Sequence, residues 1–115
     1  DFRAELIVEV ASSSESIDLH AKRRDYEQAG VWEYVVVVLP QRVVRWFVLQ
    51  DGTYREVGAD AHELFKSTVF PGLWLDGPAL LRRDVRQVMT TLQHGIETPE
   101  HAAFVQQLQA RCSAS

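Results

Sequence analysis

Glu9 and Lys22 are the two residues whose types and positions most suggest chemistry. Glu9 lies in the apolar run "LIVEV" at residues 6–10, which predicts a buried β-strand because aliphatic and β-branched residues favour strands. An ionised carboxylate is costly in apolar surroundings unless a cation, a hydrogen-bond network or a metal ion compensates its charge. Lys22 follows in a predicted helix, where it could supply such a cation.

Alternation along the strand determines which carboxylates share a face. Residues two apart point the same way, so Glu5, Ile7 and Glu9 lie together. Four residues at about 3.3 Å each separate Glu5 from Glu9 by roughly 13 Å, which is too far for both to hold one metal ion. We therefore expect Glu5 outside the site. Taken alone, Glu9 could also be a partly exposed residue of an edge strand.

Three functional side chains share one side of the helix that follows. Asp18, Lys22 and Tyr26 are spaced i, i+4 and i+8, a spacing that aligns side chains along a helix. The same spacing is typical of an exposed ion pair between Asp18 and Lys22, which would stabilise the helix only slightly. The spacing alone leaves both interpretations open.

The order of the predicted elements indicates an α/β or α+β domain. A strand at residues 3–10 is followed by a helix that ends at Ala29, because Gly30 is a usual helix terminator. Ser12 and Glu15 have the spacing of a capping box at the start of that helix.

A three-stranded antiparallel meander is predicted next. The run at 34–39 is apolar without alternation, which indicates a strand covered on both faces. Strands at 42–50 and 53–57 follow, joined by the hairpin signal Asp51-Gly52.

Two helices are predicted at the end of the chain. The first runs from Pro78 to Gly95, and the second begins at Thr98-Pro99. The second is expected to bury Phe104, Val105 and Leu108. We therefore interpret residues 1–115 as a single domain with a helical extension over about 76–111.

The segment "ELIVEVASSSESIDLHAKRRDYEQAGVWEYVVV" resembles the central part of the Uma-type restriction endonuclease family, within the PD-(D/E)xK nuclease superfamily. "FPGLWLD" at residues 70–76 resembles the end segment of that family. The residues that match in order and register are Glu9-Val10, Ser12 to Ser14, Asp18, Lys22, Tyr26 and Ala29-Gly30-Val31.

This resemblance implies a restriction endonuclease-like mixed sheet flanked by helices, and an endonuclease that cleaves nucleic acid, with DNA as the expected substrate. It implies Mg²⁺ or Mn²⁺ as cofactor, with Glu9 as a catalytic metal ligand. The superfamily lysine normally stands at the position of Ala11, and the resemblance moves its function to Lys22. Asp18 and Tyr26 would support the site.

Two departures from the family pattern leave a second function open. Ala4-Glu5 stands where the family has Pro-Asp, and the family's upstream aspartate has no counterpart here. We therefore expect the domain to be N-terminally incomplete, or to be a catalytically inactive nuclease-like module for interaction or oligomerisation. A sheet that lacks its first strands should pair through its edge, which predicts a homodimer.

Charge and composition restrict the partners. The net charge of −4 argues against general coating of nucleic acid. A local basic surface remains, with Arg23 and Arg24 as the proposed nucleic-acid contacts, and no apolar run is long enough to span a membrane. The single cysteine, Cys112, fits a reducing compartment and hence the cytoplasm. No zinc-ligand spacing links the histidines, which are expected at the surface: His20, His62, His94 and His101.

Overall fold

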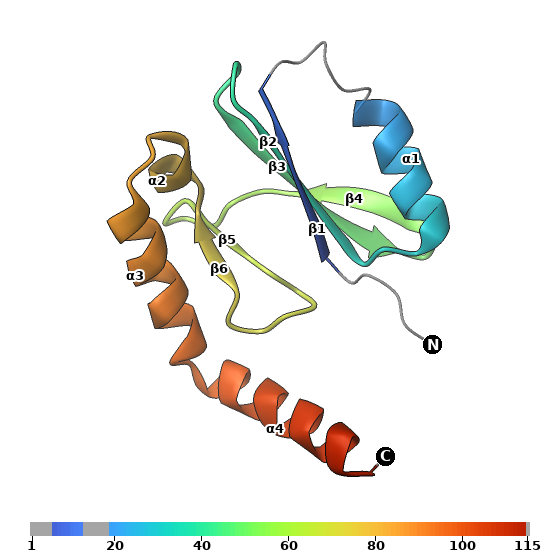
Figure 1. Cartoon of the computed structure of the whole chain (residues 1–115), viewed down its shortest axis with the longest axis vertical. Coiled ribbons are helices and arrows are strands. Elements are labelled where there is room, and N and C mark those ends of the chain that lie inside the picture. Colours follow the sequence, from blue (N-terminus) through green and yellow to red (C-terminus); the bar gives the residue numbers. More distant parts are fainter. Residues whose placement is uncertain (1–5, 13–18, 115) are drawn as a thin grey trace. The chain divides into compact units, whose positions relative to one another are not determined.

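The computed structural model describes residues 6–12 and 19–114 (Figure 1). Their contacts separate the chain into two compact units, residues 1–58 and 59–115, each with its own sheet. The interpretation of residues 1–115 as one domain therefore stays a prediction.

The first unit is a four-stranded mixed sheet with one helix. Its elements are β1 (Leu6–Ala11), α1 (Leu19–Ala29), β2 (Glu33–Val38), β3 (Val43–Gln50) and β4 (Thr53–Val57). The strand order is β1-β2-β3-β4. β1 runs parallel to β2, and the other two pairings are antiparallel. This mixed sheet with its helix confirms the α+β class expected of a restriction endonuclease-like domain.

The predicted meander is present in β2, β3 and β4. All six residues of β2 are buried, as its unbroken apolar run requires of a central strand. The β3–β4 hairpin turns at Asp51 and Gly52, whose φ angles of 53° and 81° are both positive. Two successive positive φ angles are typical of the tight Asp-Gly hairpin turn, so the sequence signal is confirmed.

Helix α1 runs alongside the sheet in Figure 1 and covers the face that carries the core. Tyr26 of α1 packs against buried side chains of β2 and β3, a cluster that comprises Tyr34, Val36, Val38 and Phe47. The helix ends at Ala29, and Gly30 follows with a φ of 79°, as predicted. Glu15 of the proposed capping box lies outside the described residues.

The second unit combines a two-stranded antiparallel sheet with three helices. The strands are β5 (Leu64–Lys66) and β6 (Trp74–Asp76), which the sequence analysis did not predict. The helices are α2 (Gly77–Leu81), α3 (Val85–Ile96) and α4 (Pro99–Ala114). None of the helices in the described part of the chain is both long and apolar enough to cross a membrane.

The first of the two predicted C-terminal helices is interrupted. Arg83 has a φ of 61°, a left-handed conformation that an α-helix cannot contain. Asp84 then starts α3 as its N-cap, because its carboxylate accepts a hydrogen bond from the backbone N–H of Gln87 at 3.1 Å. A continuous helix from Pro78 to Gly95 was therefore a wrong prediction.

Two predictions of burial were also wrong. Leu108 on α4 is 42% exposed. On the outer face of β1, Val8 and Val10 are 57% and 58% exposed. β1 is an edge strand among the described residues, and within the first unit α1 covers the opposite face, which carries Ile7 and Glu9. An apolar run therefore marks the strand correctly but does not show that both of its faces are covered.

Candidate active site

Glu9 is the centre of a polar cluster between β1 and α1. Its side chain points to the same face as Ile7, toward the helix. Lys22 Nζ lies 3.3 Å from both Oε1 and Oε2 of Glu9, and the Tyr26 hydroxyl donates a hydrogen bond to Oε1 at 2.7 Å. The predicted proximity of Glu9 and Lys22 is confirmed. The side chains are 19% and 41% exposed respectively, so the pair is accessible from solvent.

The contacts of this cluster fix its protonation state. The hydrogen bond from Tyr26, aided by Lys22, lowers the pKa of Glu9 below its ordinary value of 4.5. The same bond raises the pKa of Tyr26 above 10.0, because ionising the phenol would place a second negative charge beside Glu9. At neutral pH Glu9 is therefore a carboxylate and Tyr26 a neutral phenol.

The other predicted site residues have different outcomes. Asp18 and Glu5 lie outside the described residues, so their expected positions stay predictions. Lys22 pairs with Glu9 of the neighbouring strand, so its role is not limited to an exposed ion pair within the helix. The two predicted nucleic-acid contacts differ in environment: Arg23 is partly buried and lines a pocket, whereas Arg24 is exposed.

The described residues contain no complete set of metal ligands at Glu9. Within 6–12 and 19–114, no group of three or more His, Cys, Asp or Glu side chains is placed to hold a metal. Mg²⁺ often takes one or two carboxylates and completes its shell with waters and phosphate oxygens. Glu9 therefore fits as one ligand of such a site, although the Lys22 ammonium occupies the same two oxygens.

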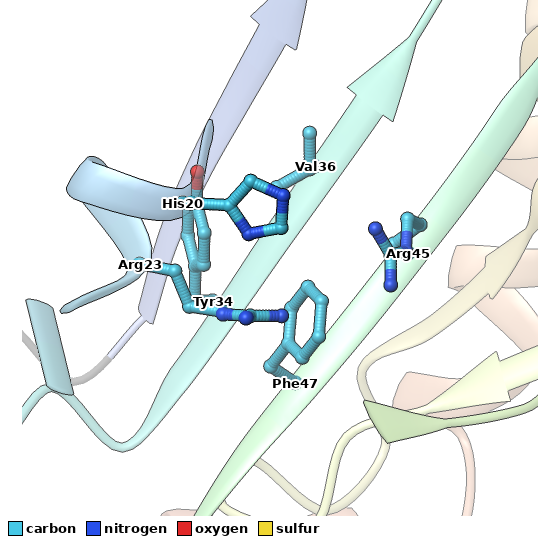
Figure 2. A pocket seen from close by; sticks show the side chains of 6 residues that line it. All are labelled: His20, Arg23, Tyr34, Val36, Arg45 and Phe47. Atoms are coloured by element: carbon cyan, nitrogen blue, oxygen red, sulfur yellow. The ribbon is translucent and has the colours of Figure 1, made fainter. Parts of the chain in front are cut away.

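A pocket of about 60 Å³ lies on the same face of the sheet as Glu9 (Figure 2). Tyr26 of the Glu9 cluster connects to it through a ring contact with Tyr34, with centroids 5.1 Å apart. The guanidinium carbons of Arg23 and Arg45 lie 5.3 and 5.2 Å from the centroid of the Phe47 ring. The residues that line the pocket are His20, Arg23, Tyr34, Val36, Arg45 and Phe47.

The sequence analysis did not identify this pocket. His20 and Arg23 share a helix face because they are three residues apart, and Arg45 and Phe47 share a strand face because they are two apart. The two sets face one pocket only through the strand register, which pairs Tyr34 with Phe47. That register was the missing information. His20 is exposed, as expected, but it also lines the pocket.

Comparison with known proteins gives one match. The family model Uma2, described as "Putative restriction endonuclease", matches residues 3–78, which include both the Glu9 cluster and the pocket. No curated protein and no solved structure matches the chain significantly.

Proposed function

The chain belongs to the Uma2 family, and we propose that it carries the catalytic region of a metal-dependent endonuclease that hydrolyses phosphodiester bonds in DNA. The observation that carries this proposal is the approach of Lys22 Nζ to both carboxylate oxygens of Glu9, at 3.3 Å. A β-strand acid and a helix lysine are thereby brought together at a solvent-accessible position. Phosphodiester hydrolysis needs such a combination of an oxygen ligand and a cation.

Each residue of the cluster has a proposed role. Glu9 is the protein ligand of Mg²⁺ or Mn²⁺, which when bound would supply charge neutralisation at the phosphate and activation of a water molecule. Lys22 orients the attacking water or binds a phosphate oxygen, through ammonium protons that now contact Glu9. Tyr26 positions the carboxylate and keeps it ionised. Asp18 is proposed to support the site, with Arg23 and Arg24 as contacts to nucleic acid.

Hydrolysis forms a bond between the water oxygen and phosphorus, and it breaks the bond between phosphorus and the leaving oxygen of the sugar. The attacking water loses a proton, and the leaving oxygen gains one. Negative charge increases on the oxygens of the phosphate during this step, and the ammonium group of Lys22 stabilises that charge. Because the pKa of Glu9 is lowered, the carboxylate is in the form that binds a divalent cation.

The proposal is tested by calorimetry with MgCl₂ or MnCl₂ and by plasmid nicking. Glu9→Gln should remove most metal binding, because it removes the negative charge of the side chain. The shape of the side chain is nearly preserved, so the effect can be assigned to the charge. Lys22→Ala should retain metal binding and lower nicking by about 100-fold or more, in the range that a positioned catalytic group contributes.

The chain offers a matched control for the lysine substitution. Lys66 pairs with Asp60 at 3.2 Å in the second unit and is 44% exposed, much as Lys22 is. Lys66→Ala should therefore leave nicking unchanged. Metal binding that survives Glu9→Gln, or metal-dependent nicking that survives Lys22→Ala, contradicts the assigned roles.

A specific observation favours a second function, that of an inactive nuclease-like interaction module. Both oxygens of Glu9 already have protein partners, and the described residues contain no group of three or more His, Cys, Asp or Glu side chains placed to hold a metal ion. In that case the cluster stabilises the fold, and neither metal binding nor nicking is expected from the unmodified protein. The same two assays therefore decide between the two functions.

We also propose that the protein forms a homodimer in the cytoplasm. Val8 and Val10 form an apolar surface on β1, which is an edge strand among the described residues, and such edges tend to pair. Sedimentation should show a dimer that Val8→Lys shifts toward monomer. Unmodified protein that remains monomeric at high concentration would contradict this proposal.

A further inference from the structure

We infer that the pocket beside the Glu9 cluster binds a phosphate group of the nucleic-acid strand, next to the phosphodiester at Glu9 and Lys22. This inference rests on the proposed function, because it names a second contact for the same substrate. It is argued from the charges that line the pocket, from a buried hydroxyl and from the size of the pocket.

Arg23 provides a guanidinium group that forms no ion pair among the described residues. Its guanidinium carbon lies over the face of Phe47. Arg45 differs, because Glu56 accepts two hydrogen bonds from its guanidinium group, at 2.7 and 3.1 Å. The pocket therefore has one guanidinium group in a salt bridge with Glu56 and a second, that of Arg23, which Glu56 attracts without an ion-pair contact among the described residues. Arginine binds phosphate well because its planar group can donate two parallel hydrogen bonds.

Tyr34 provides a hydroxyl to which the described part of the chain offers no hydrogen-bond partner. The side chain is fully buried, and its oxygen has no hydrogen-bond partner among the described residues. Burial raises the pKa of Tyr34 to about 12, so the hydroxyl remains a donor at neutral pH. A buried polar group without a partner costs stability. Because this oxygen is covered from solvent in the free protein, an acceptor oxygen in the adjoining pocket would satisfy it once neighbouring side chains move aside.

The size and walls of the pocket restrict what it can bind. A water molecule needs roughly 10–15 Å³ of comparable volume, so the pocket of about 60 Å³ has room for several waters or one phosphate group. It is too small for a whole nucleotide. Phe47 and Val36 provide apolar walls, which exclude water and strengthen hydrogen bonds between Arg23 and an anion.

The location of the pocket connects it to the proposed site of cleavage. Tyr26 donates to Glu9, and its ring contacts the ring of Tyr34, so one pair of aromatic residues separates the two sites. Both lie on the face of the sheet that α1 covers. A single strand can therefore place one phosphate at Glu9 and another in the pocket. A terminal and an internal phosphate of the strand both have oxygens that can accept these hydrogen bonds.

The test is fluorescence anisotropy of a labelled DNA oligonucleotide with the full chain in EDTA, where metal-dependent cleavage cannot occur. Arg23→Gln should weaken binding by about 10-fold, as expected for loss of a charge-assisted hydrogen bond. Tyr34→Phe should weaken it about 3- to 10-fold through loss of one hydrogen bond. Oligonucleotides with and without a 5′-phosphate distinguish a terminal from an internal phosphate, since only terminal binding depends on that group.

Arg55→Gln is the matched control. Arg55 is an exposed arginine on β4, and it points away from α1 because its neighbour Tyr54 packs on the α1 side. The Arg55→Gln substitution should weaken DNA binding by no more than about twofold, the general effect of one surface charge. Equal losses for Arg23→Gln and Arg55→Gln, or unchanged binding in both pocket variants, would overturn the inference. If the inference is wrong but the proposed function is right, nicking still depends on Glu9 and Lys22. If DNA binding depends on the pocket but no nicking occurs, only the proposed activity is refuted.

Discussion

The Glu9 cluster and the neighbouring pocket use similar side chains in opposite ways. In the cluster, the carboxylate of Glu9 is bonded by both Lys22 and Tyr26, so each charge and the phenol have a protein partner. In the pocket, the hydroxyl of Tyr34 and the guanidinium group of Arg23 have no hydrogen-bonding partner among the described residues. The first arrangement is satisfied by the fold itself. The second leaves groups that a bound ligand would satisfy.

This difference indicates where binding energy is available. A metal ion at Glu9 has to compete with the ammonium group of Lys22, so its binding is expected to be weak without substrate. An anion in the pocket displaces no protein partner of Arg23. We therefore expect the pocket to contribute to affinity for nucleic acid and the cluster to contribute to reaction rate.

The largest predicted effect concerns Phe47, which belongs both to the pocket and to the core. Phe47 is 4% exposed and stacks on Tyr34 with centroids 6.0 Å apart. Phe47→Ala should lower the free energy of unfolding by about 3–4 kcal/mol, because it leaves a cavity in the core. Urea denaturation measures this loss.

Val85→Ala is the control for Phe47→Ala, because Val85 is 68% exposed and its truncation should change the free energy of unfolding by less than about 0.5 kcal/mol. A loss of less than about 1 kcal/mol for Phe47→Ala would show that the pocket is not built on the core. The comparison with the Glu9 cluster would then lose its structural basis.

Much of the Glu9 cluster was predictable from local sequence. Strand alternation placed Glu9 with Ile7, and helix spacing placed Lys22 with Tyr26, so one strand–helix contact was enough to bring them together. The pocket depends on cross-strand register, which pairs Val36 with Arg45. Register is set by the whole sheet and is not encoded in a short segment.

The errors in the C-terminal part also have physical causes. The apolar spacing from Pro78 to Gly95 fits a continuous helix, but Arg83 adopts a positive φ angle that periodicity does not reveal. Gly95 was predicted to end that helix, yet it lies within α3. A Cβ atom there would collide with the carbonyl oxygen of Gly72, so the glycine permits close packing.

The second predicted effect compares the buried Tyr34 with the partly buried Tyr54. Tyr54 donates a hydrogen bond to the carbonyl oxygen of Val31 at 2.8 Å, whereas the hydroxyl of Tyr34 has no partner in the described part of the chain. Tyr54→Phe should lower the free energy of unfolding by about 1 kcal/mol, and Tyr34→Phe should raise it by a similar amount, because it removes a buried unpaired group. Thermal denaturation measures both changes.

The opposite signs of these changes are the informative result. Both substitutions remove one oxygen from a tyrosine ring that packs in the same core cluster, so each serves as the control for the other. If Tyr34→Phe destabilises the protein as much as Tyr54→Phe does, the hydroxyl of Tyr34 is satisfied in the free protein. The pocket would then resemble the Glu9 cluster.

The smallest predicted effect is the pH dependence of the cluster. The folded pKa of Glu9 lies below its ordinary value of 4.5, so its stabilising contribution is fully present above pH 4.5 and is lost as the pH falls through the folded pKa. The stability advantage of the unmodified protein over Glu9→Gln should shrink across that acidic range. A partly exposed pair should contribute no more than about 1 kcal/mol.

The cause of this shift can be separated by NMR titration of the Glu9 side chain. The hydrogen bond from Tyr26 lowers the pKa of Glu9 more than the contacts with Lys22 do individually. Tyr26→Phe should therefore raise that pKa toward 4.5, and Lys22→Gln should raise it as well, whereas the control Tyr54→Phe leaves it unchanged because Tyr54 does not contact the carboxylate. An unchanged pKa in Tyr26→Phe would show that the hydroxyl does not hold the carboxylate ionised. One hydrogen bond of the Glu9 cluster would then be missing, and the difference between the paired cluster and the pocket would be smaller.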